Sequence, residues 1–384
     1  MPDPSADLAD WVRLTAIPGV GGETQRHLLK AFGLPGSVFA ASGSAVRGVI
    51  GAALAERLAS HDATAEIEAA LAWAAEPGNR IVTLADSDYP QALLATVDPP
   101  ALLYVKGRAE LLNRPAVAIV GSRNATKQGE ANAEAFAATL SAAGLTVVSG
   151  LALGIDAAAH RGALGGAGST LAFIGTGADR IYPASNEPLT REIAGKGCIV
   201  SEFPLGMAAL PGNFPRRNRL IAGVSLGCLV VEAAERSGSL ITARLALDAG
   251  REVFAIPGSI HSPLAKGCHK LIKQGAKLVE KAEDILEELR WERPPSSRSD
   301  QSVALSPKEG DGGRGRSNAM TEDGEGPILA VLGHDPCSLD TLAARSGLTP
   351  AHLLAMLLPL ELEGRVAQLP GGLYQRLSRG QGSN

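Results

Sequence analysis

Residues 211–243 hold the densest group of side chains and backbone donors that can bind phosphate. Three cations and one amide stand together at the predicted start of a helix: Arg216, Arg217, Asn218 and Arg219. Further donors precede the next predicted helix: Ser237, Gly238 and Ser239. Guanidinium groups bind phosphate oxygens in pairs, and glycine exposes backbone N–H groups, so this segment suits a phosphate-bearing polymer. An isolated RRNR run is equally typical of a solvated loop, and the other motifs decide between the two.

A second phosphate-compatible motif follows the first strand of a predicted sheet: Gly121, Ser122 and Arg123. Glycine lets a ligand approach the backbone closely, serine can hydrogen-bond an oxygen, and arginine can hold a phosphate at two points. The chain has no G-x-G-x-x-G after this strand and no GxxxxGK[ST] anywhere. Chemistry on nucleoside triphosphates is therefore not predicted.

Two more loops carry residues of the same kind. Ser149 and Gly150 end the next predicted strand, and backbone N–H groups at such a strand-to-helix turn suit an anion. In the loop 177–186, Arg180 can meet phosphate, Tyr182 can stack on a base, and Asn186 can read a base edge or fix the loop. For Tyr182 the alternative is an anchor of the loop or core.

The remaining polar residues near these loops have structural interpretations. We expect Asp156 to cap the helix that follows Gly150, and His160 to lie at the surface of that helix without binding metal. Glu202 and Glu232 are the carboxylates near these loops, and Glu232 is expected to balance nearby arginines rather than to act as a base. The sequence thus predicts no catalytic residue and no metal ligand.

All these motifs follow short apolar segments that alternate with helical ones from residue 115 onward. The predicted strands are 117–120, 145–148, 171–174, 198–200, 229–231 and 253–256. Short continuous apolar strands between helices predict an α/β fold with a mainly parallel sheet covered on both faces. Ligands of such sheets bind beyond the carboxyl ends of the strands, where every motif lies.

The composition changes along the chain predict four segments: a helical domain at 1–80, the α/β core at 81–291, a flexible linker at 292–326, and a further domain with a tail at 327–384. The linker is rich in Pro, Gly, Ser and charge. Ile17–Gly21 is similar to the turn of a helix-hairpin-helix unit, for which a plain structural turn is the alternative.

The last segment has three predicted helices followed by a β-hairpin, which is the order of a winged helix. Its presumed recognition helix, 349–358, contains neither Lys nor Arg. Because DNA-reading helices need phosphate and base contacts, this helix is expected to bind protein or to pack on its own domain.

The net charge, the cysteines and the apolar runs of the chain restrict its possible functions and cellular location. The net charge of −4 argues against nucleic acid for the surface as a whole, although a local basic patch is sufficient for binding. The four cysteines lack metal-binding spacing and are expected to be reduced thiols in a cytoplasmic protein. No apolar run reaches the length of about 18 residues that a membrane span needs, so no membrane association is predicted.

Taken together and in order, the motifs resemble those of the DNA-processing protein A family. The matching words are VGSR, SGLALGID, IYPASN, SEFP, FPRRNRLIAG, VVEA, SGSLIT, FAIPG and GCHKLIKQGA. The resemblance covers residues 10–377 and is most specific over 117–276. It implies an extended Rossmann domain, an N-terminal domain of SAM or helix-hairpin-helix type, and a C-terminal winged helix.

The resemblance also implies a function. Members of this family bind and protect incoming single-stranded DNA during natural transformation, load RecA onto it, and form homodimers through the Rossmann domain. They need no cofactor and no catalytic activity. Carried over by position, Arg123 would hold a DNA phosphate in a pocket shaped by the glycine and serine before it. The other implied DNA contacts are Arg216, Arg217 and Arg219 in the same groove, Ser237–Ser239 beside it, and Lys273 of the GCHKLIKQGA word. Ala184 stands where some relatives carry a DNA-contacting lysine, a loss for which Arg180 can compensate.

Two other functions remain as alternatives. A nucleoside-monophosphate phosphoribohydrolase of Rossmann-like type would carry PGGxGTxxE, whereas this chain reads SGSLITARL without the glutamate. A transcription-type regulator would act through the winged helix, which the uncharged third helix disfavours. The sequence favours a single-stranded-DNA-binding mediator over both.

Overall fold

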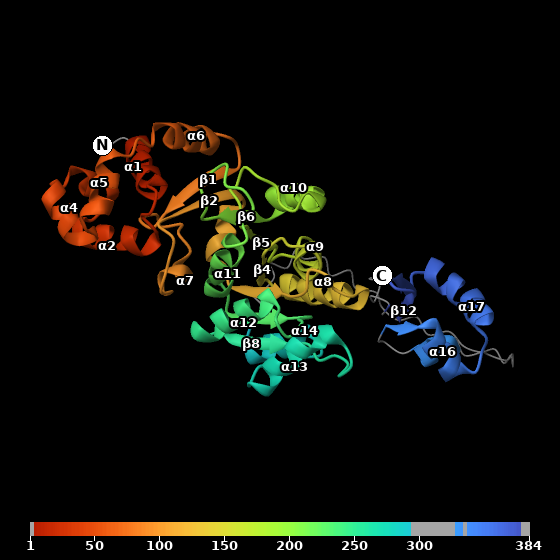
Figure 1. The fold of residues 1–384 in the computed structure, drawn as a ribbon. Coiled ribbons are helices and arrows are strands. Elements are labelled where there is room, and N and C mark those ends of the chain that lie inside the picture. Colours follow the sequence, from red (N-terminus) through yellow and green to blue (C-terminus); the bar gives the residue numbers. More distant parts are fainter. Residues whose placement is uncertain (1–3, 293–326, 333–335, 378–384) are drawn as a thin grey trace, which may run out of the picture. The chain divides into compact units, whose positions relative to one another are not determined.

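A computed structural model describes residues 4–292, 327–332 and 336–377 (Figure 1). The chain divides into two compact units, Met1–Trp291 and Glu292–Asn384, each of which is described on its own. The predicted linker, 292–326, falls outside the described residues except at its first position, and so does the end of the tail. The predicted boundary at residue 80 lies within the first unit and stays a prediction.

The first unit is built on a nine-stranded sheet of order β1-β2-β6-β5-β4-β3-β7-β8-β9. Its parallel part contains the six strands expected from the apolar runs: β3 (Ala116–Val120), β4 (Thr146–Ser149), β5 (Thr170–Phe173), β6 (Cys198–Ser201), β7 (Gly227–Val230) and β8 (Glu252–Ala255). The prediction of a mainly parallel sheet is confirmed, and the carboxyl ends of these strands meet at one edge.

Three further strands were not predicted. β1 (Asn79–Thr83) and β2 (Leu102–Gly107) pair antiparallel with each other, and β2 pairs antiparallel with β6. β9 (Lys277–Leu278) adds a short parallel strand at the other edge. An antiparallel pair needs no crossover helix, so β1 and β2 lack the alternation that marked the parallel strands.

Helices cover both faces of the sheet, as alternate residues of β3 illustrate. Val117 and Ile119 pack against α8 (Lys127–Ala142), α9 (Ile155–Ala163) and α14 (Ala282–Glu288) on one face. Ala118 and Val120 pack on the opposite face in the cluster that includes α11 (Asn213–Val224), α12 (Gly238–Asp248) and α13 (Lys266–Lys273). Successive strand residues point to opposite faces, so an uninterrupted apolar strand needs both layers. α10 (Glu187–Lys196) packs beside α9 in a smaller cluster.

Six helices precede the sheet: α1 (Pro4–Ala16), α2 (Gly22–Phe32), α3 (Pro35–Ala40), α4 (Gly43–Ile50), α5 (Ala52–Ser60) and α6 (Thr64–Ala74). α1 and α6 pack against the β1–β2 edge through an apolar cluster in which Trp73 meets Tyr104 edge-on, with ring centroids 5.6 Å apart. α2 to α5 pack mainly with α1 in a second apolar cluster. The short α7 (Gln91–Leu94) lies between β1 and β2 in the chain. The predicted helix-hairpin-helix turn connects α1 to α2.

The second unit is a winged helix. Its elements are α15 (Pro327–Leu332), β10 (Cys337–Ser338), α16 (Leu339–Ser346), α17 (Pro350–Leu362), β11 (Val366–Leu369) and β12 (Leu373–Arg376). Its sheet has the order β10-β12-β11. Leu353 and Leu357 of α17 pack in the core of this unit, whereas Leu354 and Leu358 are exposed. One face of the predicted recognition helix therefore packs in the core of its own domain.

Candidate nucleic-acid interface

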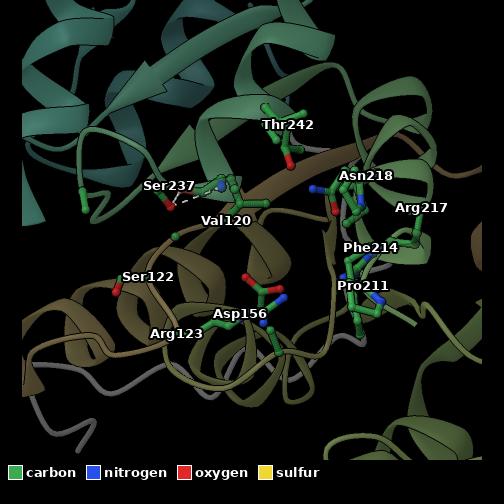
Figure 2. A pocket seen from close by; sticks show the side chains of 18 of the residues that line it. Val120, Ser122, Arg123, Asp156, Pro211, Phe214, Arg217, Asn218, Ser237 and Thr242 are labelled. Atoms are coloured by element: carbon green, nitrogen blue, oxygen red, sulfur yellow. Dashed lines mark hydrogen bonds between the residues drawn. The ribbon is translucent and has the colours of Figure 1, made fainter. Parts of the chain in front are cut away.

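A hollow of about 620 Å³ lies beyond the carboxyl ends of the parallel strands, and we call it the first hollow (Figure 2). Ser122 and Ser237 stand on one side of it, while Phe214 and Asn218 of α11 face them. It gathers many of the residues that the sequence singled out: Gly121, Ser122, Arg123, Tyr182, Arg217, Asn218, Ser237, Gly238 and Ser239. Loops from distant parts of the sequence thus form one cavity at the expected edge.

A buried cation forms the floor of the first hollow. Arg217 is 3% exposed and its Nη1 donates a hydrogen bond to the Phe173 carbonyl at 2.6 Å. Burial lowers the pKa of Arg217 to about 10, so the guanidinium stays charged at neutral pH. Burial raises the pKa of the nearby Asp156 carboxyl, whereas the charge of Arg217 acts to lower it.

Gly150 and Ser149 shape this floor. A Cβ built on Gly150 would lie 2.5 Å from Cζ of Arg217, so only glycine leaves room for the guanidinium. The Gly150 N–H donates to Asp156 Oδ2 at 3.1 Å, and the Ser149 hydroxyl donates to the Ile119 carbonyl at 2.6 Å. Both of these polar groups are therefore engaged within the protein.

Arg123 stands at the mouth of the first hollow. Among the described residues its side chain has no ion-pair or hydrogen-bond partner. Its guanidinium carbon lies 5.3 Å from the centroid of the Phe214 ring, which in turn lies 5.7 Å from the Tyr182 ring. Tyr182 is 45% exposed. A free cation beside two aromatic rings can bind a phosphate and stack the attached base.

Sequence reasoning did not single out Phe214 as a site residue. The signal was present, because a phenylalanine directly before the PRRNR run is unusual in a chain with only 4% aromatic residues. The position of its ring between Arg123 and Tyr182 depends on loops that are distant in the sequence.

The expectation that three arginines share one groove holds only for Arg217. Arg216 and Arg219 do not line the first hollow. Both make ion pairs with Glu202, whose side chain is 1% exposed, and Arg216 does so at 3.1 Å. A helix turns by about 100° per residue, so neighbours on α11 point in different directions.

Arg219 continues this ion-pair network toward the N-terminal helices. Its Nε lies 3.4 Å from Asp98 Oδ2, and Arg26 of α2 pairs with the same carboxylate. Burial raises the pKa of Glu202, while Arg219 and Arg216 act to lower it. Glu202 therefore balances two arginines in the structure, a role that the sequence predicted for Glu232 instead.

Other predicted site residues lie around the first hollow or away from it. The Asn186 amide donates to the Leu151 and Ala152 carbonyls at 3.0 and 3.2 Å, so it fixes the loop. Arg180 lines an adjoining hollow. Lys273 is exposed near the end of α13 and lines neither cavity.

Three polar residues differ from their structural expectations. His160 is fully buried, with Nδ1 2.7 Å from the Thr170 hydroxyl, and burial lowers its pKa to about 3. The N-cap of α9 is Gly154, not Asp156. Glu232 accepts hydrogen bonds from the backbone N–H and hydroxyl of Thr126 at the start of α8, rather than balancing arginines. For His160 and Glu232, the deciding partners, Thr170 and Thr126, are not local in the sequence.

No group of three or more His, Cys, Asp or Glu side chains among the described residues is arranged to hold a metal ion. None of the helices in this part of the chain combines the length and apolar character that crossing a membrane requires.

A parallel sheet with glycine turns and arginines at the carboxyl ends of its strands defines a Rossmann-like phosphate-binding protein. Within that class the assignment is specific. The chain belongs to the DNA recombination-mediator protein A family, whose model matches residues 80–290. A DprA winged helix domain matches residues 314–372. The family resemblance and the winged helix expected from the sequence are both confirmed.

Individual relatives agree with this assignment. Protein Smf of Escherichia coli K12 is 42% identical over 323 residues, which are 82% of this chain and 81% of that protein. The X-ray structure of DNA processing protein A from Streptococcus pneumoniae matches with a TM-score of 0.65 and 37% identity, covering 75% of this chain and 99% of that one. The structure of DNA processing protein A from Helicobacter pylori is described for its single-stranded DNA binding mode. It matches with a TM-score of 0.50 and 32% identity, covering 55% of this chain and 95% of that one.

Proposed function

We propose that this recombination mediator binds single-stranded DNA in the first hollow during natural transformation. Phosphates lie against Arg123, above the buried charge of Arg217, and bases stack on Phe214 and Tyr182. The proposal is carried by the Arg123 guanidinium, which lies beside the Phe214 ring and has no ion-pair partner within the described part of the chain. The single-stranded DNA binding described for the Helicobacter pylori relative supports it.

The finer parts of this function rest on family membership. In this proposal the protein protects the strand, loads RecA onto it, and acts in the cytoplasm as a homodimer formed through the Rossmann domain, without cofactor or catalysis. The hydrolase alternative is not favoured, because Asp156, the one carboxylate among the described residues that line the first hollow, is buried and accepts a hydrogen bond from the Gly150 backbone N–H. Glu232, which the sequence considered as a possible base, accepts hydrogen bonds from Thr126.

Replacing Arg123 with alanine should weaken binding of labelled oligo-dT by about tenfold or more, because a charge-assisted phosphate contact is lost. The slope of log K against log salt should become shallower by about 0.7 for each phosphate released. Fluorescence anisotropy across a salt series measures both quantities. Arg244→Ala is the matched control, since this exposed arginine of α12 lies outside the first hollow. If Arg123→Ala and the wild type bound oligo-dT equally well, the strand would not bind in the first hollow.

Phe214→Ala should reduce the affinity for oligo-dT by about 1–3 kcal/mol, the usual contribution of one stacked base. The comparison strand is an abasic oligonucleotide of the same length, which keeps the phosphates and offers no base. We expect the preference of the wild type for oligo-dT over this strand to fall in Phe214→Ala and to persist in Phe214→Tyr. The salt slope should not change. A loss that is equal for both strands would contradict stacking on this ring.

A further inference from the structure

Three of the hollows at the strand ends follow one another, and Tyr182 lines all three. The second hollow, of about 80 Å³, shares Arg123 and Phe214 with the first. The third, of about 170 Å³, shares Leu151 and Ile174 with the second. The three hollows therefore lie next to one another around Tyr182, in the direction of α10.

The third hollow combines apolar and cationic side chains. Its apolar part includes Leu151, Ile174 and Ile199, which are at most 5% exposed within the protein. Ile181 and Tyr182 add apolar surface that is 40% and 45% exposed. Its cations are Lys106, Arg180 and Arg191. An apolar surface with a cationic rim fits a base with its phosphate, and the volume is smaller than the roughly 300–1,000 Å³ of typical drug-sized ligand sites.

Positive charge exceeds negative charge among the residues that line this hollow, which are three cations and one carboxylate, Asp179. Arg191 is paired with Glu187 at 2.6 Å, and the carboxylate of Asp179 accepts the Gly206 backbone N–H at 2.9 Å. Within the described part of the chain, neither Lys106 nor Arg180 has a side-chain hydrogen-bond or ion-pair partner. Arg216 and Arg219, by contrast, are paired with carboxylates outside the three hollows.

We propose that the third hollow binds a further nucleotide of the strand held in the first hollow. Its phosphate meets Arg180 and Lys106, and its base rests on the apolar surface beside Tyr182. The strand thus crosses the strand ends from the α12 side to α10, and Tyr182 contacts it between the two hollows. This inference rests on the proposed function, because it needs a strand in the first hollow.

The experiment measures affinity against strand length, with oligo-dT from about 4 to 16 nucleotides. The variants are Arg180→Ala, Lys106→Ala and the double variant. Lys196→Ala is the control, because this lysine lies on α10, pairs with Glu192 and lines none of the three hollows. We expect the shortest strands to bind every variant like the wild type. Longer strands should bind the double variant about tenfold more weakly, with a salt slope reduced by about 0.7 per lost phosphate contact.

Each other result overturns the inference in a recognisable way. If the double variant binds strands of every length with wild-type affinity, the third hollow does not bind the strand. The proposed function still stands in that case if Arg123→Ala loses binding. If the double variant loses the same affinity at every strand length, or if Lys196→Ala loses as much, the effect comes from the overall charge of the protein and not from the third hollow. Binding of free dTMP that depends on Arg180, without any length effect, assigns the hollow to a mononucleotide instead. Absence of binding by the wild type overturns both proposals.

Discussion

Arg219→Ala is expected to lower the free energy of unfolding by about 3–5 kcal/mol, the largest stability loss that the ion-pair network predicts. Arg219 is 18% exposed and contacts both Glu202 and Asp98. Without it, the nearly inaccessible Glu202 carboxylate keeps only Arg216 as a partner, and an incompletely paired buried charge is costly. Urea denaturation at neutral pH without DNA measures this loss.

The control for this prediction is Arg216→Ala. Its side chain is 51% exposed, so its pair with Glu202 is expected to contribute about 1 kcal/mol or less. Adding Glu202→Gln to Arg219→Ala should restore part of the lost stability, because the buried charge is then removed. A loss below about 1 kcal/mol in Arg219→Ala, or no recovery in the double variant, would contradict the interpretation.

The loss should also depend on pH. Burial raises the pKa of Glu202 in the folded protein, and removing Arg219 should raise this pKa further. A carboxyl with a raised folded pKa favours the folded state when it is protonated, and this contribution is lost as pH rises through the folded value. The difference between Arg219→Ala and wild type should therefore shrink on acidification from neutral pH to about 5.

Gly150→Ala is the second substitution with a large expected effect. The added methyl would overlap the Arg217 guanidinium, which is buried and hydrogen-bonded to Phe173. Overpacking and the displaced hydrogen bond together should cost about 3 kcal/mol of folding free energy. Because Arg217 lies under the first hollow, oligo-dT affinity should fall as well. Urea denaturation and anisotropy measure the two effects.

Gly195→Ala is the matched control. Gly195 lies in α10, and a Cβ there would meet nothing within 4 Å. Alanine at such a helical position should leave stability unchanged or raise it by about 0.4–1 kcal/mol. If Gly150→Ala were as stable as Gly195→Ala and bound DNA equally well, the floor of the first hollow would not need its glycine.

Much of the fold could be predicted because the parallel strands are short apolar runs. Such a run has to be covered on both faces, as Val117 and Ala118 of β3 show by packing into different clusters. Strands β1 and β2 were not predicted, because their pairing depends on contacts such as Gly107 with Cys198. Neither segment displays such long-range pairing locally.

Some residues of the candidate site could be predicted from the sequence, and others could not. Arg123 and Ser237 follow predicted strands, so the topology alone places them at the cavity. The direction of each side chain on α11 was not predictable, because Asp98 and Glu202, which hold Arg219, approach from other loops. Lys106 was not predicted as a site residue, because it lies on β2, a strand that was not predicted either.

The contact between the N-terminal helices and the sheet limits how this protein can change in evolution. The family model begins at residue 80, inside β1, yet Trp11 and Trp73 share one apolar cluster with Leu102 and Tyr104 of β2. Arg26 adds an ion pair to Asp98 across the same junction. The helices thus cover apolar residues of β2 that would otherwise be exposed. A lineage that lost or replaced them would need polar substitutions on β2, or a new cover, to keep the sheet from aggregating.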